Sequence, residues 1–233
     1  MCFSATASFG AGVILSAIGV ASLKKVQHKS QIMFAGIPLL FAVQQFSEGI
    51  LWLILPRLDL QYLEGGITYF FLIFAQVVWP VYVPVSILLL EKQKTRRNFQ
   101  RILAGIGLLV SYHLAYCLFN YKVRAEIDCY HINYIQLYPQ KFRVLSGILY
   151  GIVTIVPSFF SHIRRMWMLG VTIFISYIIF ALFYETYLVS VWCFFASIIS
   201  ISVWIIMREI KTLTRTEILE NLHVTNSSLK NKK

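Results

Sequence analysis

Long apolar runs follow one another along this chain, with short polar connections between them. A transmembrane helix needs about 20 mostly apolar residues to cross the roughly 30 Å hydrocarbon core of a bilayer. We place seven such runs, near residues 3–23, 31–55, 66–90, 102–119, 144–160, 166–185 and 187–207. They predict an all-α fold, an integral membrane bundle of seven transmembrane helices.

The composition indicates a membrane protein without a separate soluble domain. Apolar residues make up 58% of the 233 residues and charged residues 13%, whereas soluble domains average about 45–50% and about 25%. The runs and their connections use nearly the whole chain. We therefore expect one transmembrane domain, residues 1–207, and a cytoplasmic tail, residues 208–233, that is amphipathic and basic.

Basic residues set the expected orientation, because Lys and Arg in short loops stay on the cytoplasmic side. Loops 24–30, 91–101 and 161–165 and the tail carry sixteen Lys and Arg, and the opposite side carries five. The amino terminus is therefore expected outside and the carboxyl terminus in the cytoplasm, in a bacterial inner membrane. Anionic lipid head groups are the expected partner of this positive charge. The basic residues form no patch interleaved with aromatic residues, which argues against nucleic-acid binding.

Polar side chains inside the predicted spans indicate a binding site, because ionisable groups in a bilayer are costly unless they face the protein interior. In "FAVQQFSEGILW" the helical period places positions 44, 45, 48 and 52 within one arc of about 100°. The fourth span, "SYHLAYCLFN", has a second polar arc. Most of these residues lie in the outer halves of the spans, so we expect a polar cavity that opens outward. Its expected ligand-binding residues are Gln44, Gln45, Glu48, Trp52, Gln76, His113, Tyr116 and Glu185.

Cysteines also map to the outer half of the predicted bundle, and the sequence leaves their role open. Cys2 and Cys129 lie at the rim, where an oxidising exterior would allow a disulfide between the first helix and the loop 120–142. Packing thiols are one alternative. A metal site that combines "CYH" with His113 and Glu48 is another, but no spacing is diagnostic and no metal is assigned. A catalytic Cys2 would need a base for its thiolate, which the free α-amine could supply.

Three further patterns predict local structure. The centre of the loop 120–142 alternates polar and apolar residues over 128–134, which favours a short strand or hairpin that covers the cavity as a lid. Pro80 and Pro84 predict bends within the third span. Small residues four apart in the first span predict close helix packing through Ser8, Gly12 and Ser16.

The opening "MCFSATASFGAGVILSAIGVASL" and the later "PLLFAVQQFSEGILWL" resemble an uncharacterised bacterial family of seven-span membrane proteins that begin Met-Cys-Phe-Ser-Ala. The resemblance is specific over about the first sixty residues. It implies a multi-pass membrane fold. The family has no established activity, so the resemblance transfers no catalytic residue.

The function we expect is a small-molecule or ion transporter, or a receptor-like binder, with Glu48 as the ionisable centre that takes a cation or a proton and His113 as its hydrogen-bond partner. The alternative is a membrane-embedded enzyme, either a Cys2 thiol catalyst or a hydrolase that uses Glu48 and His113, with or without a metal. A purely structural protein is the third class. The sequence assigns no cofactor and no oligomeric state.

Overall fold

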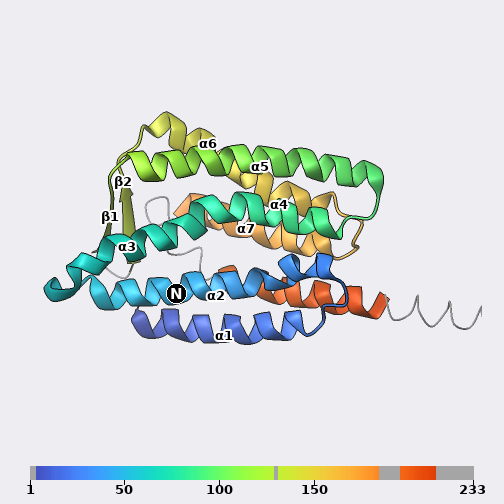
Figure 1. Ribbon diagram of the computed structural model, residues 1–233, viewed down its shortest axis with the longest axis horizontal. Coiled ribbons are helices and arrows are strands. Elements are labelled where there is room, and N and C mark those ends of the chain that lie inside the picture. The colour runs from blue at the N-terminus through green and yellow to red at the C-terminus, as the bar shows by residue number, and fades with distance from the viewer. Residues whose placement is uncertain (1–3, 129–130, 184–194, 214–233) are drawn as a thin grey trace, which may run out of the picture.

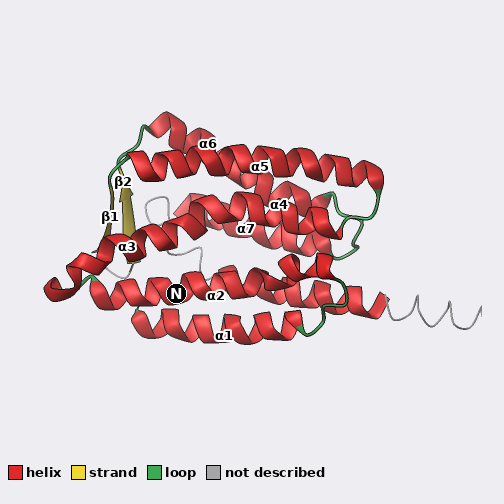
Figure 2. Ribbon diagram, viewed as in Figure 1, coloured by secondary structure: helices red, strands yellow, loops and turns green. Residues whose placement is uncertain are grey.

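The computed structural model describes residues 4–128, 131–183 and 195–213. Its helices lie side by side along one long axis, and one β hairpin stands at one end of the bundle (Figure 1 and Figure 2). The labelled helices are α1 (Ala5–Leu23), α2 (Ile32–Ile54), α3 (Gln61–Leu72), α4 (Trp79–Leu90), α5 (Lys94–Asn120), α6 (Gln140–Phe159) and α7 (Met166–Phe183). Residues 195–213 form a further helical stretch.

Helices of membrane-spanning length account for much of the described chain, and the molecule is a multi-pass membrane protein. Among the described residues, four helical segments are long and apolar enough to cross a bilayer: Ala5–Leu23, Lys29–Ile54, Leu58–Leu90 and Lys94–Asn120. The helices α6 and α7 contain shorter apolar stretches, Arg143–Phe159 and Met166–Ile179. The all-α bundle is thereby confirmed, while the count of seven spans and the orientation stay predictions.

The start of one predicted span differs from the structure. The helix α5 begins at Lys94 rather than at 102, because the basic residues before the apolar run continue the same helix. The last predicted run, 187–207, lies partly outside the described residues. Its described part continues as helix to residue 213.

Close packing between α1 and α2 depends on small residues. The buried face of α1 consists of Ser8, Gly12, Leu15, Gly19 and Ser22. A Cβ atom on Gly12 would lie 2.8 Å from the Phe46 ring of α2, so only glycine allows this approach. Ser16, which we predicted to share this face, is only half-buried and donates its hydroxyl to the Gly12 carbonyl at 2.8 Å. The face follows alternating steps of three and four residues instead of a strict step of four.

The span Leu58–Leu90 is interrupted near its middle. Residues Ile73–Val78 form a π-helix between α3 and α4, and Pro80 lies two residues after its end. In a π-helix the carbonyl of residue 75 would accept the N–H of residue 80, but a proline has no N–H. The Ala75 carbonyl instead accepts the hydroxyl of Tyr150 from α6 at 2.9 Å. The predicted prolines therefore do disrupt this span, and a neighbouring helix supplies the missing donor.

The helix α5 packs against the same interrupted segment at Gly107. A Cβ atom on Gly107 would overlap the carbonyl oxygen of Pro80. That carbonyl has lost its own helical donor, because Pro84 lies four residues later. One turn along α5, Ser111 donates its hydroxyl to the Val77 carbonyl at 2.6 Å. The α5 helix thus both approaches the broken span closely and provides a hydrogen bond to it.

Strands β1 (Val123–Asp128) and β2 (His131–Gln136) form an antiparallel hairpin. The hairpin is longer than the strand we expected over 128–134, and it covers a small apolar core. That core contains Leu51, Phe71, Leu72, Leu118, Ala125 and Ile132.

The hairpin is attached to α3 by two contacts. The Tyr134 ring stacks on Phe71 with centroids 4.8 Å apart, and the Glu64 carboxylate accepts the Ala125 N–H at 3.1 Å.

A larger apolar core joins α1, α2, α4, α7 and residues 195–213 along the bundle.

Candidate functional site

Three polar side chains of α2 lie inside the bundle. Gln44 and Gln45 are each 1% exposed and Glu48 is 0% exposed, whereas Val43 and Leu53 on the other side of the helix are 40% and 47% exposed. The prediction that this arc of α2 faces inward is therefore confirmed for these three residues.

One hydrogen bond joins Gln45 to Glu48, and another joins Gln44 to α4. Gln45 Nε2 donates to Glu48 Oε2 at 3.3 Å, and Trp79 Nε1 donates to Gln44 Oε1 at 3.0 Å. The Trp79 ring also stacks on Phe41 with centroids 4.1 Å apart. We call Gln44, Gln45, Glu48 and Trp79 the α2 polar cluster. Because Trp79 directly follows the π-helix, the cluster joins α2 to the interrupted span.

Trp52 continues the same arc toward the hairpin end of α2. It is half-buried and packs against the small core beneath the hairpin. Its Nε1 atom is buried and has no hydrogen-bond partner among the described residues. An indole N–H in that position is a donor available to a ligand or to water.

The polar arc of α5 does not lie opposite the α2 polar cluster. His113 is half-buried, and its Nε2 atom is 3.7 Å from the Cys117 Sγ on the same helix. The prediction that Tyr116 faces the bundle is wrong, since its side chain is 55% exposed. The helix α5 packs on α4, α6 and the π-helix, so α4 separates it from α2 (Figure 1).

The remaining predicted residues are placed only in part. Gln76 is half-buried within the π-helix. Cys2, Cys129 and Glu185 lie outside the described residues, so the rim, the disulfide and the Cys2 catalyst stay predictions. Cys117 is a buried free thiol. Within the described ranges, no group of three His, Cys, Asp or Glu is arranged to hold a metal ion.

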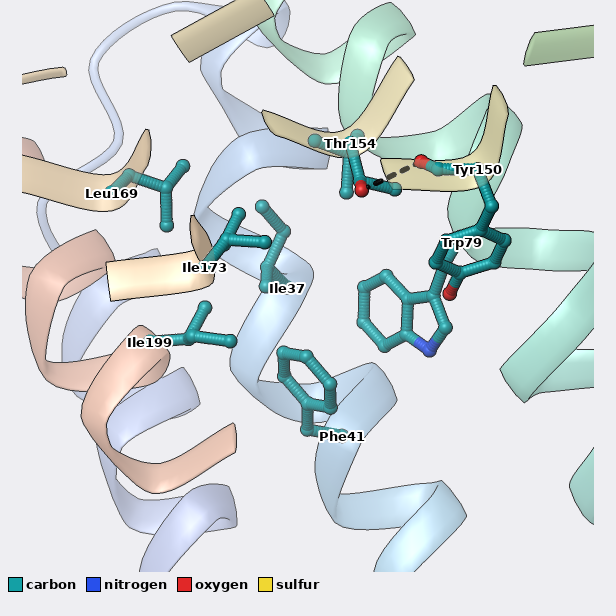
Figure 3. A pocket seen from close by; sticks show the side chains of 9 residues that line it. Ile37, Phe41, Trp79, Tyr150, Thr154, Leu169, Ile173 and Ile199 are labelled. Carbon is teal, nitrogen blue, oxygen red and sulfur yellow. Dashed lines mark hydrogen bonds between the residues drawn. The ribbon is translucent and has the colours of Figure 1, made fainter. Parts of the chain in front are cut away.

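A small apolar cavity lies beside the cluster, at the centre of the bundle (Figure 3). Its volume is about 20 Å³, room for roughly one water molecule. Nine residues from α2, α4, α6, α7 and residues 195–213 line it, and all are apolar except Trp79, Tyr150 and Thr154. None of the predicted ligand-binding residues lines this cavity. No local sequence pattern marks it, because its wall combines residues from five helical segments.

The polar groups of the cavity wall are already engaged. The Tyr150 hydroxyl donates to Ala75, the Thr154 hydroxyl donates to the Tyr150 carbonyl at 2.8 Å, and the Trp79 indole donates to Gln44. Because these three donors already bind acceptors within the protein, the cavity wall has little to hydrogen-bond a polar ligand. A space of this size with apolar walls is expected to be dry.

A second buried carboxylate, which the sequence did not single out, lies at the opposite end of the bundle from the hairpin. Glu91 follows α4 directly, and its side chain is 0% exposed. It accepts the His162 N–H at 2.9 Å and the Gln93 N–H at 3.0 Å, and its Oε1 atom lies 2.9 Å from the His162 Nδ1. Burial alone would raise the pKa of Glu91, but the hydrogen bonds from His162 and Gln93 outweigh it and hold the pKa below its ordinary value.

These contacts join the α4–α5 connection to the α6–α7 connection. Arg96 adds a hydrogen bond to the Ser161 carbonyl at 2.6 Å, and Gln100 adds one to the Pro157 carbonyl at 2.8 Å. Every group that Glu91 holds belongs to a connection between helices. The arrangement is therefore that of a structural clamp rather than of a binding site.

Comparison with known proteins places the sequence in a family and gives no functional name. The model of a family described as "Family of unknown function (DUF6629)" matches residues 1–217. No curated protein and no solved structure matches the chain.

Proposed function

The chain belongs to this family of unknown function, and we propose that it is a small-molecule or ion transporter, or a receptor-like binder, whose site is the α2 polar cluster. The complete burial of Glu48 within a membrane-spanning helix carries the proposal. Glu48 lies six residues before the end of α2 at Ile54, about 9 Å along the helix axis. A carboxyl group at that depth is costly, and such residues in membrane proteins usually serve transport or ligand binding.

The chemistry of the cluster favours a cation, a proton or a small polar molecule. Carboxylate and amide oxygens are the ligands that hard cations prefer. Amide groups such as those of Gln44 and Gln45 both donate and accept hydrogen bonds, which suits a neutral polar solute. Glu48 would be the ionisable centre, because it is the acidic member of the cluster. Orientation with the amino terminus outside, a bacterial inner membrane and an outward opening belong to the same proposal.

The alternative enzyme has less support. A hydrolase that uses Glu48 and His113 would need both side chains at one reacting centre, but His113 lies on α5, which packs on α4 and α6 rather than along α2. The other sequence-based site members, Trp52, Gln76 and Glu185, stay in the proposal as secondary ligand-binding residues on the sequence pattern alone.

The test is a thermal-shift titration of the purified full chain in detergent with Na⁺, K⁺, Mg²⁺, Ca²⁺ and a panel of amino acids, sugars and organic cations. We expect at least one of them to raise the unfolding temperature of the wild type and to lose this effect in Glu48→Gln. Glu64→Gln is the matched control, because it removes a carboxylate that binds the hairpin backbone outside the cluster. A ligand that stabilises wild type and Glu48→Gln equally would refute the site.

A further inference from the structure

Positive charge is concentrated at the end of the bundle opposite the hairpin. The described parts of this end carry twelve Lys and Arg: three in the α1–α2 connection, five around the α4–α5 connection, two between α6 and α7, and two near residue 210. Two acidic residues accompany them, and both are engaged. Glu91 binds His162 and Glu209 binds Arg165 at 3.1 Å. These connections all meet at the end of the molecule away from β1 and β2 (Figure 1).

One exposed stripe along α5 combines this charge with an apolar surface. Steps of three and four residues place its members on one face of the helix. All six members are exposed, and Leu108 and Tyr112 are 61% and 73% exposed. From the charged end inward, the α5 stripe consists of Lys94, Arg97, Arg101, Gly105, Leu108 and Tyr112.

The length of α5 sets the depth of each part of the stripe. Its 27 residues extend about 40 Å, which exceeds the roughly 30 Å hydrocarbon core. We therefore expect the first two turns, with the three cations, to project into the head-group layer and Leu108 and Tyr112 to lie at the depth of the acyl chains. A Cβ atom on Gly105 would meet nothing within 4 Å, so no other described part of the protein covers the stripe one turn after Arg101.

The protein itself does not neutralise the three cations. Lys94, Arg97 and Arg101 take part in no ion pair with any described residue, and the first turn of α5 holds no acidic residue. Arg101 donates a hydrogen bond to Asn98, a neutral side chain, at 2.9 Å. By contrast, Arg165 is paired with an acid and Arg96 is used to hold a backbone carbonyl.

We propose that the α5 stripe is a binding site for an anionic phospholipid. The negatively charged head group binds Lys94, Arg97 and Arg101, and an acyl chain lies on Gly105, Leu108 and Tyr112. Charge complementarity selects an anion, and the continuous apolar surface directly below the cations selects one that carries a hydrocarbon chain. The site is separate from the α2 polar cluster, so it stands whether or not that cluster binds a ligand.

Native mass spectrometry of the purified full chain tests this site by lipid titration. The two lipids are phosphatidylglycerol and phosphatidylcholine with identical acyl chains. The stripe variant is Lys94→Gln/Arg97→Gln/Arg101→Gln. The matched control is Lys24→Gln/Lys25→Gln/Lys29→Gln, which removes the same charge from the same end of the bundle. A single Arg97→Gln variant serves if the stripe variant is unstable.

We expect the wild type and the control to prefer phosphatidylglycerol and the stripe variant to bind it roughly a hundredfold more weakly, since each of its three basic residues contributes roughly fivefold near an anionic surface. The single variant should lose about fivefold. Three results would overturn the proposal: no preference for phosphatidylglycerol in the wild type, an equal loss in both triple variants, or displacement of the lipid by glycerol phosphate at equal concentration. The last result would mean that the stripe recognises a free phosphate and not a lipid.

Discussion

Replacing Glu91 with glutamine is expected to destabilise the end of the bundle where the α4–α5 and α6–α7 connections meet. The Glu91 carboxylate accepts from the backbone N–H groups of Gln93 and His162, and its Oε1 atom lies 2.9 Å from the His162 Nδ1. Both of its oxygens are used, and the side chain has no access to water. A glutamine there keeps the size of the side chain but has one acceptor oxygen and one NH₂ donor.

The magnitude follows from the number of hydrogen bonds lost. In either orientation of the amide, its NH₂ group faces at least one N–H donor, so at least one hydrogen bond to the charged group is lost. Such a bond contributes about 1.5–3 kcal/mol, and the buried donor left behind adds a desolvation cost. We expect Glu91→Gln to lower the free energy of unfolding by about 2–4 kcal/mol. Glu91→Ala removes both hydrogen bonds and the contact with the His162 ring, and should cost about 3–5 kcal/mol.

A second acid at the same end supplies the control. Glu209 pairs with Arg165, whose side chain is 54% exposed. Exposed pairs contribute about 0–1 kcal/mol, so Glu209→Gln should change stability by less than Glu91→Gln does. Unfolding by SDS titration in mixed detergent micelles measures all three variants against the wild type. A Glu91→Gln protein within about 0.5 kcal/mol of the wild type would refute the account of the clamp.

Acid titration gives an independent check of the same carboxylate. The folded pKa of Glu91 lies below its ordinary value of 4.5. A lowered folded pKa means that the stabilisation is fully present above the unfolded pKa and is lost as the pH falls through the folded pKa. The free energy of unfolding of the wild type should therefore fall toward that of Glu91→Gln as the pH drops below 4.5. A constant difference between the two proteins down to pH 3 would contradict this assignment.

Two further changes test the interrupted span by the same unfolding assay. Gly107→Ala places a methyl group against the Pro80 carbonyl, a backbone atom that has little room to move, and should cost about 1–3 kcal/mol or more. Gly105→Ala, half a turn earlier and open to the surroundings, should instead be neutral or stabilise by up to about 1 kcal/mol, and equal effects of the two would refute the close contact. Tyr150→Phe removes the donor to the Ala75 carbonyl and should cost about 1–3 kcal/mol. A Tyr150→Phe protein as stable as the wild type would show that this carbonyl has another donor.

Sequence reasoning succeeded on α2 and failed on Tyr116 for a common physical reason. Amide and carboxyl groups are costly in contact with lipid, so the face of α2 that carries Gln44 and Glu48 had to turn inward. A tyrosine has an amphipathic ring that is favoured at the membrane–water interface. Tyr116 lies near the end of α5 and is exposed there. Its hydroxyl was therefore weak evidence for an inward face, although the helical arc included it.

Other features depend on contacts between residues far apart in the sequence. Glu91 and His162 are 71 residues apart, and nothing in the residues around either predicts the other. The available signal in the sequence was a single acidic residue among basic residues at the end of a helix. A glutamate that is fully buried almost always has a partner, but the sequence does not identify that partner. The π-helix could be anticipated from Pro80 only as a disruption, because the sequence does not say which backbone carbonyl finds a new donor.

The interrupted span also separates two kinds of polar residue inside this membrane bundle. Tyr150 and Ser111 each donate to a carbonyl of the π-helix, so the broken helix explains why they are there: unsatisfied backbone groups in lipid are costly. Glu48 takes part in a hydrogen bond of another kind, because its bond with Gln45 joins two side chains. A polar residue in a membrane helix is therefore weaker evidence for function where a hydrogen bond to the backbone explains its presence. For Glu48, which is fully buried in α2, we propose that this function is the binding of a cation, a proton or a polar solute.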